Sequence, residues 1–282
     1  MARALLIATQ GEGHVEPNPM VGCVIARGEK IICEGWHAKY GEAHAEAAAL
    51  RSTDDDVAGA TMYVTLEPCS HHGKTPPCAD AIVEAGIGRV VIAQEDPFPQ
   101  VAGRGIQRLR EAGIEVTTGV LAAEARQLNA PYLARVVEKR PWIIAKWAMT
   151  LDGKLASRTG DSQWISGESS REIVHALRGR VDSVLVGRGT AAADNPLLTA
   201  RPAGARVATR IVVDTTAQLA LDSQLVKTAS AAPVLIAVGQ QADDQKCDAL
   251  RSAGCQVLVC DCLLYTSPSP RDATLSRMPS SA

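Results

Sequence analysis

Short apolar runs alternate with amphipathic stretches along the first half of the chain, which is the pattern of an α/β fold. After a first helix at Met1–Ala8, the runs predict strands at residues 21–26 and 30–34, joined by a turn at Gly28. The expected elements that follow are helix 43–51, strand 62–66, helix 78–84, strand 90–93, helix 105–112 and strand 114–117. Strands interleaved with helices predict a three-layer α/β/α sandwich with right-handed crossovers.

The second half repeats this alternation after a helical connector at residues 122–141, which closes with Lys139-Arg140-Pro141. A strand expected at Trp142–Ala148 starts the second α/β series. The series continues with helix 169–178, strands 183–186, 210–214 and 234–238, helix 243–253 and strand 256–259. We therefore expect a first domain at residues 1–121 and a second at 142–260, with the boundary near Pro141.

Residues 261–282 break this pattern, because Ser, Pro and Arg dominate them and no strand or helix period remains. Such a segment cannot bury enough apolar surface to order itself, so we expect it to be disordered. It begins abruptly in the middle of an α/β series and resembles the translation of a sequencing adapter fused to a truncated reading frame. A natural disordered tail is the alternative interpretation.

Composition narrows the class of protein. The chain is 46% hydrophobic with a net charge of -2, which leaves no basic footprint for nucleic acid. A few local Arg and Lys residues could still hold a small anionic substrate. No apolar run approaches the roughly 20 residues of a membrane span. The eight Cys residues suit a reduced cytoplasmic protein better than a disulfide framework. Cys69 and Cys78 are explained as metal ligands, and Cys23 and Cys33 lie in apolar strands.

The most informative motif is His44-Ala-Glu46, followed by Pro68-Cys69 and then Cys78. One imidazole and two thiolates fill three positions around zinc, and a catalytic zinc site leaves the fourth position for water. The metal acidifies that water so that it can act as hydroxide near neutral pH. Glu46 is then free to carry protons from the water to the departing amine. The sequence therefore predicts a zinc deaminase.

A structural zinc module is the alternative from a different class of function. Structural sites normally have four protein ligands, whereas this motif offers three and a spare carboxylate. A fourth ligand from His71 or His72 would favour the structural interpretation, and a zinc-bound water would exclude it.

The run from His44 to Glu46 and the segment Pro68–Cys78 resemble the deaminase half of bifunctional riboflavin-biosynthesis deaminase–reductases. The eight residues between the two Cys, Ser-His-His-Gly-Lys-Thr-Pro-Pro, are typical of that branch; most cytidine-type deaminases have two. Asn18–Gly22 and the Asp96–Gly105 motif also match. The resemblance implies hydrolytic deamination of a diaminopyrimidinone ribotide phosphate. The implied roles are zinc binding by His44, Cys69 and Cys78, proton donation by Glu46, and substrate ordering by Asn18. His71, His72 and Lys74 are candidates for substrate contact.

The same resemblance implies that the second domain is a reductase with a dihydrofolate-reductase-like fold, which uses NADPH to open the ribose into a ribityl chain. The matching segments are Lys146–Lys154, Ser162–Ser166, Val186–Thr190 and Asp194–Thr199. Arginine forks suit phosphate oxygens. The implied substrate contacts are Ser162, Arg178, Leu198 and Arg201. The implied NADPH contacts are Ala148, Trp164, Thr190, Asp194 and Thr215.

One departure from the family concerns its later Glu-Gly-Gly segment, in place of which this chain runs into the Ser/Pro/Arg tail. The expectation is therefore an incomplete reductase domain, impaired in activity and stability. The competing enzymatic interpretation is a zinc deaminase of another nucleoside or of a tRNA base. The long loop between Cys69 and Cys78 and the acidic charge balance disfavour it. The resemblance also implies a homo-oligomer.

Overall fold

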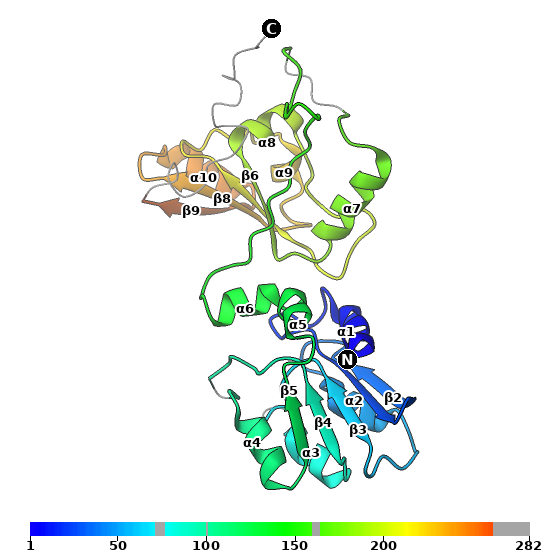
Figure 1. Cartoon of the computed structure of the whole chain (residues 1–282). Coiled ribbons are helices and arrows are strands. Elements are labelled where there is room, and N and C mark those ends of the chain that lie inside the picture. The colour runs from blue at the N-terminus through cyan, green and yellow to red at the C-terminus, as the bar shows by residue number, and fades with distance from the viewer. Residues whose placement is uncertain (71–76, 100, 160–163, 262–282) are drawn as a thin grey trace. The chain divides into compact units, whose positions relative to one another are not determined.

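A computed structural model of the chain describes residues 1–70, 77–99, 101–159 and 164–261 (Figure 1). The chain divides into two compact units, Met1–Ile144 and Ala145–Ala282. Within the described ranges, no helix is both long and apolar enough to cross a membrane.

The first unit is built on a five-stranded sheet with the order β2-β1-β3-β4-β5. Its strands are β1 (Gly22–Arg27), β2 (Lys30–Trp36), β3 (Thr61–Val64), β4 (Arg89–Ile92) and β5 (Glu115–Thr118). The β1–β2 hairpin is antiparallel and turns at Gly28, whose φ of 62° lies in the left-handed region that glycine adopts without strain. β1 is also antiparallel to β3, whereas β3, β4 and β5 run parallel.

Helices cover both faces of this sheet, which confirms the expected three-layer sandwich. On one face, α2 (Ala45–Arg51), α3 (Cys78–Glu84) and α4 (Arg104–Glu111) share a core with alternate residues of the strands, such as Ile25 and Met62. The neighbouring strand residues point to the opposite face, where Val24 and Tyr63 meet α1 (Ala2–Ala8). A short 3₁₀ turn, η1 (Thr9–Gly11), follows α1.

The structure adds detail to three local expectations for this unit. The connector is two helices, α5 (Ala122–Leu128) and α6 (Ala130–Val136), because Asn129 interrupts the helical backbone with a φ of -100°. α2 begins after His44, which is its N-cap residue. β3 stops at Val64, two residues before the expected end at residue 66, and an irregular segment carries the chain onward to Cys69.

The second unit contains a parallel sheet with the order β6-β7-β8-β9. Its strands are β6 (Ser183–Gly187), β7 (Thr209–Val213), β8 (Val234–Gly239) and β9 (Gln256–Cys260). Its helices are α7 (Glu168–Arg178), α8 (Arg188–Asp194), α9 (Gln224–Lys227) and α10 (Asp244–Ser252). Val212, Ile236 and Val238 of the central strands form its core with Leu225 of α9 and Leu250 of α10.

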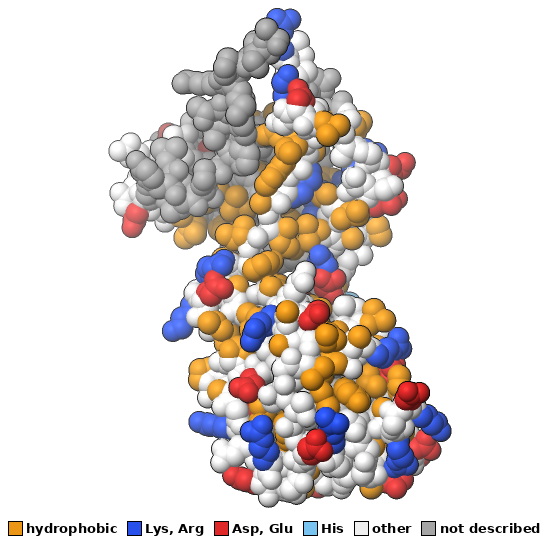
Figure 2. All heavy atoms as spheres, viewed as in Figure 1, with side chains coloured by type: hydrophobic (Ala, Val, Ile, Leu, Met, Phe, Trp, Pro, Cys, Tyr) orange, Lys and Arg blue, Asp and Glu red, His pale blue; other side chains and the backbone are white. Residues whose placement is uncertain are grey.

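The strand expected at Trp142–Ala148 is absent, and this expectation was wrong. The segment has no regular structure, and its apolar side chains are exposed, with Ile143 at 74% and Trp142 at 48%. Hydrophobic side chains at the surface are orange in Figure 2. An apolar run shows which residues favour a strand, but a strand forms only where another backbone accepts its hydrogen bonds. No strand in the described ranges pairs with this segment. The helices α8 and α9, conversely, were not expected from the sequence.

A candidate metal centre and its surroundings

His44, Cys69 and Cys78 converge in the first unit, and their ligand atoms all lie within 4.8 Å of one another. His44 Nδ1 is 3.5 Å from the sulfur of Cys69 and 3.4 Å from that of Cys78. Zinc–nitrogen and zinc–sulfur bonds of about 2.0 and 2.3 Å place the two atoms about 3.5 Å apart across a tetrahedral angle. The three side chains therefore fit the edges of a zinc tetrahedron.

Two helix starts and one loop hold these ligands in place. His44 caps α2 in an extended conformation, and Cys78 is the first residue of α3, after the N-cap Pro77. Cys69 is tied to the start of α3 by two backbone donors: Cys78 N–H donates to its sulfur at 3.3 Å, and Ala79 N–H donates to its carbonyl oxygen at 3.1 Å. The unpaired N–H groups of a helix start thus favour a thiolate at Cys69.

The pKa shifts within the cluster also favour a thiolate at Cys69. The Cys78 thiol donates to Cys69, which lowers the pKa of Cys69 to about 4 and raises that of Cys78 well above its ordinary value. The contact with Cys69 also raises the pKa of the His44 imidazole. The cluster therefore shares protons among its three members, and a divalent cation can replace those protons.

Glu46 is the buried acid of the site. It lies in the first turn of α2 and is 3% exposed. Burial raises the pKa of its carboxyl to about 7, with the positive charge of His44 opposing that rise. A carboxyl with a pKa near neutrality can both accept and release a proton at the working pH of most enzymes, which is the requirement for a proton carrier.

His37 is a residue of this site that sequence reasoning missed. It is 3% exposed, and its ring meets that of His44 edge-on at a centroid distance of 5.5 Å. Burial lowers the pKa of His37, which favours the neutral ring. Its Nδ1–H then donates to the carbonyl oxygen of Ala43 at 2.9 Å, and its Nε2 accepts from the Asn18 amide at 3.3 Å. The His37 ring thus lies between Asn18 and His44 and connects Asn18 to the metal cluster.

Glu67 is the second such residue. Its side chain is buried and accepts four backbone hydrogen bonds, from Gly105 and Ile106 at Oε1 and from Asp96 and Gly103 at Oε2. These bonds join the segment that leads into Cys69 to the segment 96–106. The acidic residue directly before Pro68-Cys69 was the available signal, but its partners lie too far away in the sequence to be inferred.

Several expected contact residues lie outside the described residues: His71, His72 and Lys74 of the loop between the two Cys ligands, and Ser162 of the second unit. The adapter-like segment also lies outside them, apart from Asp261.

In the second unit, the structure brings Arg178 and Arg201 together. Arg178 ends α7, and burial together with the nearby charge of Arg201 lowers the pKa of its guanidinium. His175, one turn earlier on α7, accepts a hydrogen bond from the backbone N–H of Arg201 at 3.2 Å. Its own pKa is lowered by burial and then by Arg201 and Arg178. Three cationic or potentially cationic groups close enough to influence one another's pKa suit a phosphate.

A second group of expected residues gathers at the carboxyl edge of the parallel sheet, where open α/β sheets bind ligands. Gly187 at the end of β6 pairs with Val213 at the end of β7. Thr190 and Asp194 lie on α8, directly after β6, and Thr215 lies just beyond β7. Leu198 follows α8 and is buried, with a φ of 58°.

Neither Ala148 nor Trp164 lies in a helix or strand. Ala148 lies in the irregular segment that follows Pro141, and Trp164 lies in a turn before α7. Trp164 is 71% exposed, and the guanidinium carbon of Arg171 lies 4.6 Å from its ring centroid.

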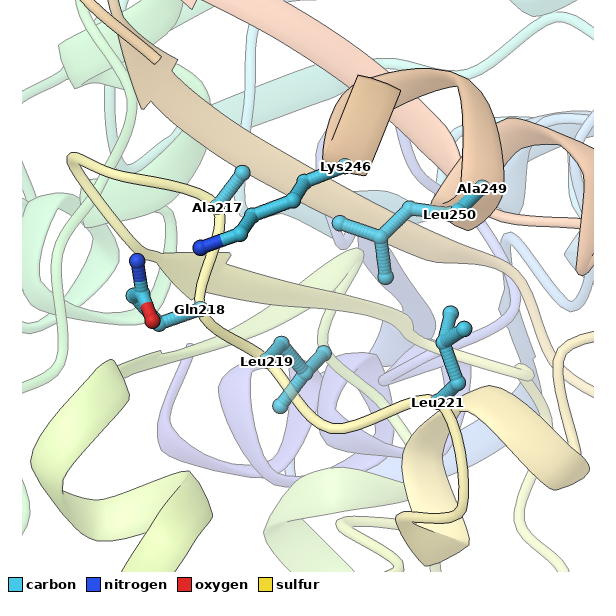
Figure 3. Close-up of a pocket in the computed structure, with 7 residues that line it drawn as sticks. All are labelled: Ala217, Gln218, Leu219, Leu221, Lys246, Ala249 and Leu250. Carbon is cyan, nitrogen blue, oxygen red and sulfur yellow. The ribbon is translucent and has the colours of Figure 1, made fainter. Parts of the chain in front are cut away.

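A small cavity of about 190 Å³ lies between the turn after β7 and α10 (Figure 3). Its lining residues are Ala217, Gln218, Leu219, Leu221, Lys246, Ala249 and Leu250. Its volume is below the ~300 Å³ at which ligand pockets usually begin, so we assign no ligand to it.

Comparison with known proteins relates both units to characterised families. The family model described as "Cytidine and deoxycytidylate deaminase zinc-binding region" matches residues 1–94, and that described as "RibD C-terminal domain" matches residues 141–270. The chain is 46% identical to the riboflavin biosynthesis protein RibD of Actinobacillus pleuropneumoniae, over 92% of this chain and 69% of that protein. It is 43% identical to RibD of Aquifex aeolicus, over 92% of this chain and 72% of that protein.

Solved structures give the same result. The Thermotoga maritima diaminohydroxyphosphoribosylaminopyrimidine deaminase/5-amino-6-(5-phosphoribosylamino)uracil reductase matches with a TM-score of 0.83 at 39% identity, over 94% of this chain and 74% of that one. Acinetobacter baumannii RibD matches with a TM-score of 0.78 at 35% identity, with the same coverage of each chain.

Proposed function

Because this chain belongs to the RibD family of riboflavin-biosynthesis proteins, we propose that its first unit hydrolytically deaminates a diaminopyrimidinone ribotide phosphate. We propose further that its second unit takes the product and reduces the ribose to a ribityl chain with NADPH. The first reaction replaces a ring amino group with oxygen from water and releases ammonia. The second opens the ribose by addition of hydride.

The observation that carries the deaminase proposal is the triangle of His44 Nδ1 and the two sulfurs, with a buried carboxyl beside it. His44, Cys69 and Cys78 would hold zinc, which would supply a Lewis acid that acidifies a water molecule at neutral pH. Three protein ligands would leave one coordination position for that water.

Glu46 is assigned the proton transfers. Its carboxylate removes a proton from the attacking water, delivers it to the ring nitrogen next to the reacting carbon, and then helps to protonate the departing amine. Its pKa of about 7 keeps both protonation states accessible. Asn18, held against the neutral His37 ring, is assigned to substrate positioning.

The reductase proposal rests on two groups in the second unit. Arg178 and Arg201 lie near each other and near His175, and their charges would bind the ribose phosphate. Thr190, Asp194 and Thr215 line the carboxyl edge of the sheet and are assigned to NADPH, together with Ala148 and Trp164. Ser162 and Leu198 complete the proposed substrate contacts.

The experiment that tests these assignments is mass spectrometry of the product after the zinc-loaded chain is incubated with the ribotide, with and without NADPH. A product that has exchanged one amine for oxygen supports the deaminase. A further gain of two hydrogens that requires NADPH supports the reductase. Cytidine and a tRNA substrate serve as controls; deamination of either one, with the ribotide unchanged, would overturn the proposal.

A further inference from the structure

Asn129 holds the backbone of a residue 109 positions earlier in the chain. Its side chain is 2% exposed and lies at the junction of α5 and α6. Its Oδ1 accepts from the Met20 backbone N–H at 2.8 Å, and its Nδ2–H donates to the Met20 carbonyl oxygen at 2.9 Å. The side-chain amide thus satisfies both backbone groups of Met20, as a neighbouring β-strand would.

Two further bonds join the connector helices to loops of the same unit. Arg135 Nη2–H donates to the carbonyl oxygen of Pro17 at 3.0 Å, and so holds the same loop as Asn129. The Tyr132 hydroxyl donates to Asp96 Oδ1 at 2.8 Å and holds a second loop.

Both loops lead directly to the metal cluster. The loop at residues 17–20 carries Asn18, whose amide donates to His37, and His37 in turn donates to the carbonyl oxygen of Ala43, the residue before His44. The second loop is joined through the Asp96 backbone N–H to Glu67, which lies two residues before Cys69. The α5–α6 connector is therefore bonded to both sides of the site.

We propose that Asn129 is a positioning residue of the deaminase site, and that α5 and α6 belong functionally to that site rather than serving as a link between domains. The inference rests on the proposed deaminase function. Asn129 acts through Met20 to fix the place of Asn18 beside His37, and hence the place of the substrate relative to Glu46.

The physical reason lies in the irregular backbone of the loop. Residues 17–20 form neither helix nor strand, so the backbone groups of Met20 have no partner within a ladder. If Asn129 is shortened, two partly buried polar groups lose their partners, and the loop must move to regain hydrogen bonds from water. A displacement of about 1 Å at a substrate-positioning group is enough to lower kcat/KM by up to about a hundredfold.

The test uses the full chain with Asn129→Ala and Asn129→Asp. Asn129→Asp keeps the acceptor for Met20 N–H but sets a carboxylate oxygen against the Met20 carbonyl oxygen. Because Asp and Asn have nearly the same volume, this variant tests the loss of the donor without a change in side-chain size. Gln127→Ala is the matched control, because Gln127 is exposed on the adjoining helix. Tyr132→Phe, which removes a single hydroxyl, is the mild variant for the second loop.

The first measurement is amide hydrogen exchange at Met20 in the zinc-loaded protein without substrate. We expect exchange to be at least about tenfold faster in Asn129→Ala and unchanged in Gln127→Ala, because one hydrogen bond is lost. An unchanged exchange rate in Asn129→Ala would show that the amide does not hold the loop, and would overturn the inference whatever the kinetics show.

The second measurement is the separation of KM from kcat for deamination, with zinc content measured on the same samples. We expect KM to rise by about tenfold or more in both Asn129 variants, and kcat/KM to fall severalfold in Tyr132→Phe, with zinc content unchanged. A purely structural role would reduce kcat in proportion to zinc lost and leave KM unaltered, which would contradict the proposal. If the unmodified chain itself deaminates no ribotide, the proposed function is overturned. That outcome differs from failure of the Asn129 inference, in which the unmodified chain is active.

Discussion

Glu67 Oε1 accepts a hydrogen bond from the backbone N–H of Gly105 at 2.9 Å, and the close approach of Glu67 and Pro68 leaves no room for a side chain at residue 105. A Cβ atom there would lie 1.9 Å from the carbonyl oxygen of Pro68, far closer than two such atoms can approach. Glycine is therefore required at the second residue of α4, because the peptide that leads into Cys69 rests directly on that helix.

Gly105→Ala should push Pro68, and with it Cys69, away from the metal cluster. We expect a loss of unfolding free energy of about 1–3 kcal/mol from overpacking, together with weaker zinc binding. Denaturant unfolding and competition with a zinc chelator measure the two effects. Arg110→Ala, on the exposed side of the same helix, should change neither by more than about 0.5 kcal/mol. Unchanged zinc affinity in Gly105→Ala would contradict the coupling.

Glu46→Gln should keep the fold and the metal but remove the proton carrier. The amide is nearly isosteric with the carboxyl, so we expect zinc content to stay at the parent level. kcat for deamination should fall by a factor of about 10²–10⁴. Glu84→Gln, at the exposed end of α3, is the control and should have parent activity. Retention of full activity by Glu46→Gln would exclude the assigned role.

Removal of zinc should make the sulfur of Cys69 reactive toward thiol reagents. Cys69 has a pKa lowered to about 4 in the metal-free cluster, so the chelated protein should react with a thiol reagent at this residue even at slightly acidic pH. The zinc-loaded protein should react slowly at the same residue. Peptide mapping of the modified sites identifies the residue. Equal labelling of Cys69 with and without metal would show that this sulfur is not a zinc ligand.

Arg201→Ala should raise the pKa of His175. A nearby positive charge disfavours the imidazolium, and its removal therefore stabilises the protonated ring. Titration of the ring by nuclear magnetic resonance measures this shift without any substrate. Arg180→Ala is the control and should leave the pKa of His175 in place. The same Arg201 variant should bind the ribotide phosphate about tenfold less tightly, because one charge-assisted bond is lost.

The metal ligands could be identified from the sequence because their chemistry is local. His44 and Glu46 are two residues apart on one helix start, and Cys78 begins a predicted helix, so residue type and spacing already define the donor set. The alternation of apolar runs likewise predicted the sandwich, because burial of alternate strand residues imposes that pattern.

The supporting residues could not be found in this way. Glu67 bonds backbone groups 29 to 39 residues away, and Asn129 bonds one 109 residues away. Every residue except proline has the same backbone N–H and C=O groups, so the residue type at position 20 does not indicate that its backbone bonds Asn129. The wrong strand at Trp142–Ala148 has a related cause, because strand formation depends on a partner edge that the segment itself does not encode.

Arg210 bonds the residue before Leu198, one of the proposed substrate contacts of the second unit. The side chain is completely buried at the start of β7. Instead of an acid, its guanidinium binds oxygens: Nη1 donates to the Leu197 carbonyl at 3.2 Å and to the Thr228 hydroxyl at 2.7 Å. Nη2 donates to the carbonyls of Thr228 and Ala232. The fork thus joins the end of α9 and Leu197, the residue before Leu198, to the sheet.

Arg210→Met keeps most of the side-chain volume but leaves buried carbonyl oxygens, including that of Leu197, without a donor. We expect it to lower the unfolding free energy of the second unit by at least about 2 kcal/mol, since each unsatisfied buried acceptor costs about 1–3 kcal/mol. Arg210→Lys should be intermediate, because one ammonium cannot reproduce the planar fork. Arg251→Met, which removes only an exposed pair with Asp248, is the control. Urea unfolding with and without a zinc chelator separates the two units, because only the first should respond to the metal. A parent-like second transition in Arg210→Met would mean that these carbonyls find other donors, and that Leu198 is positioned without this arginine.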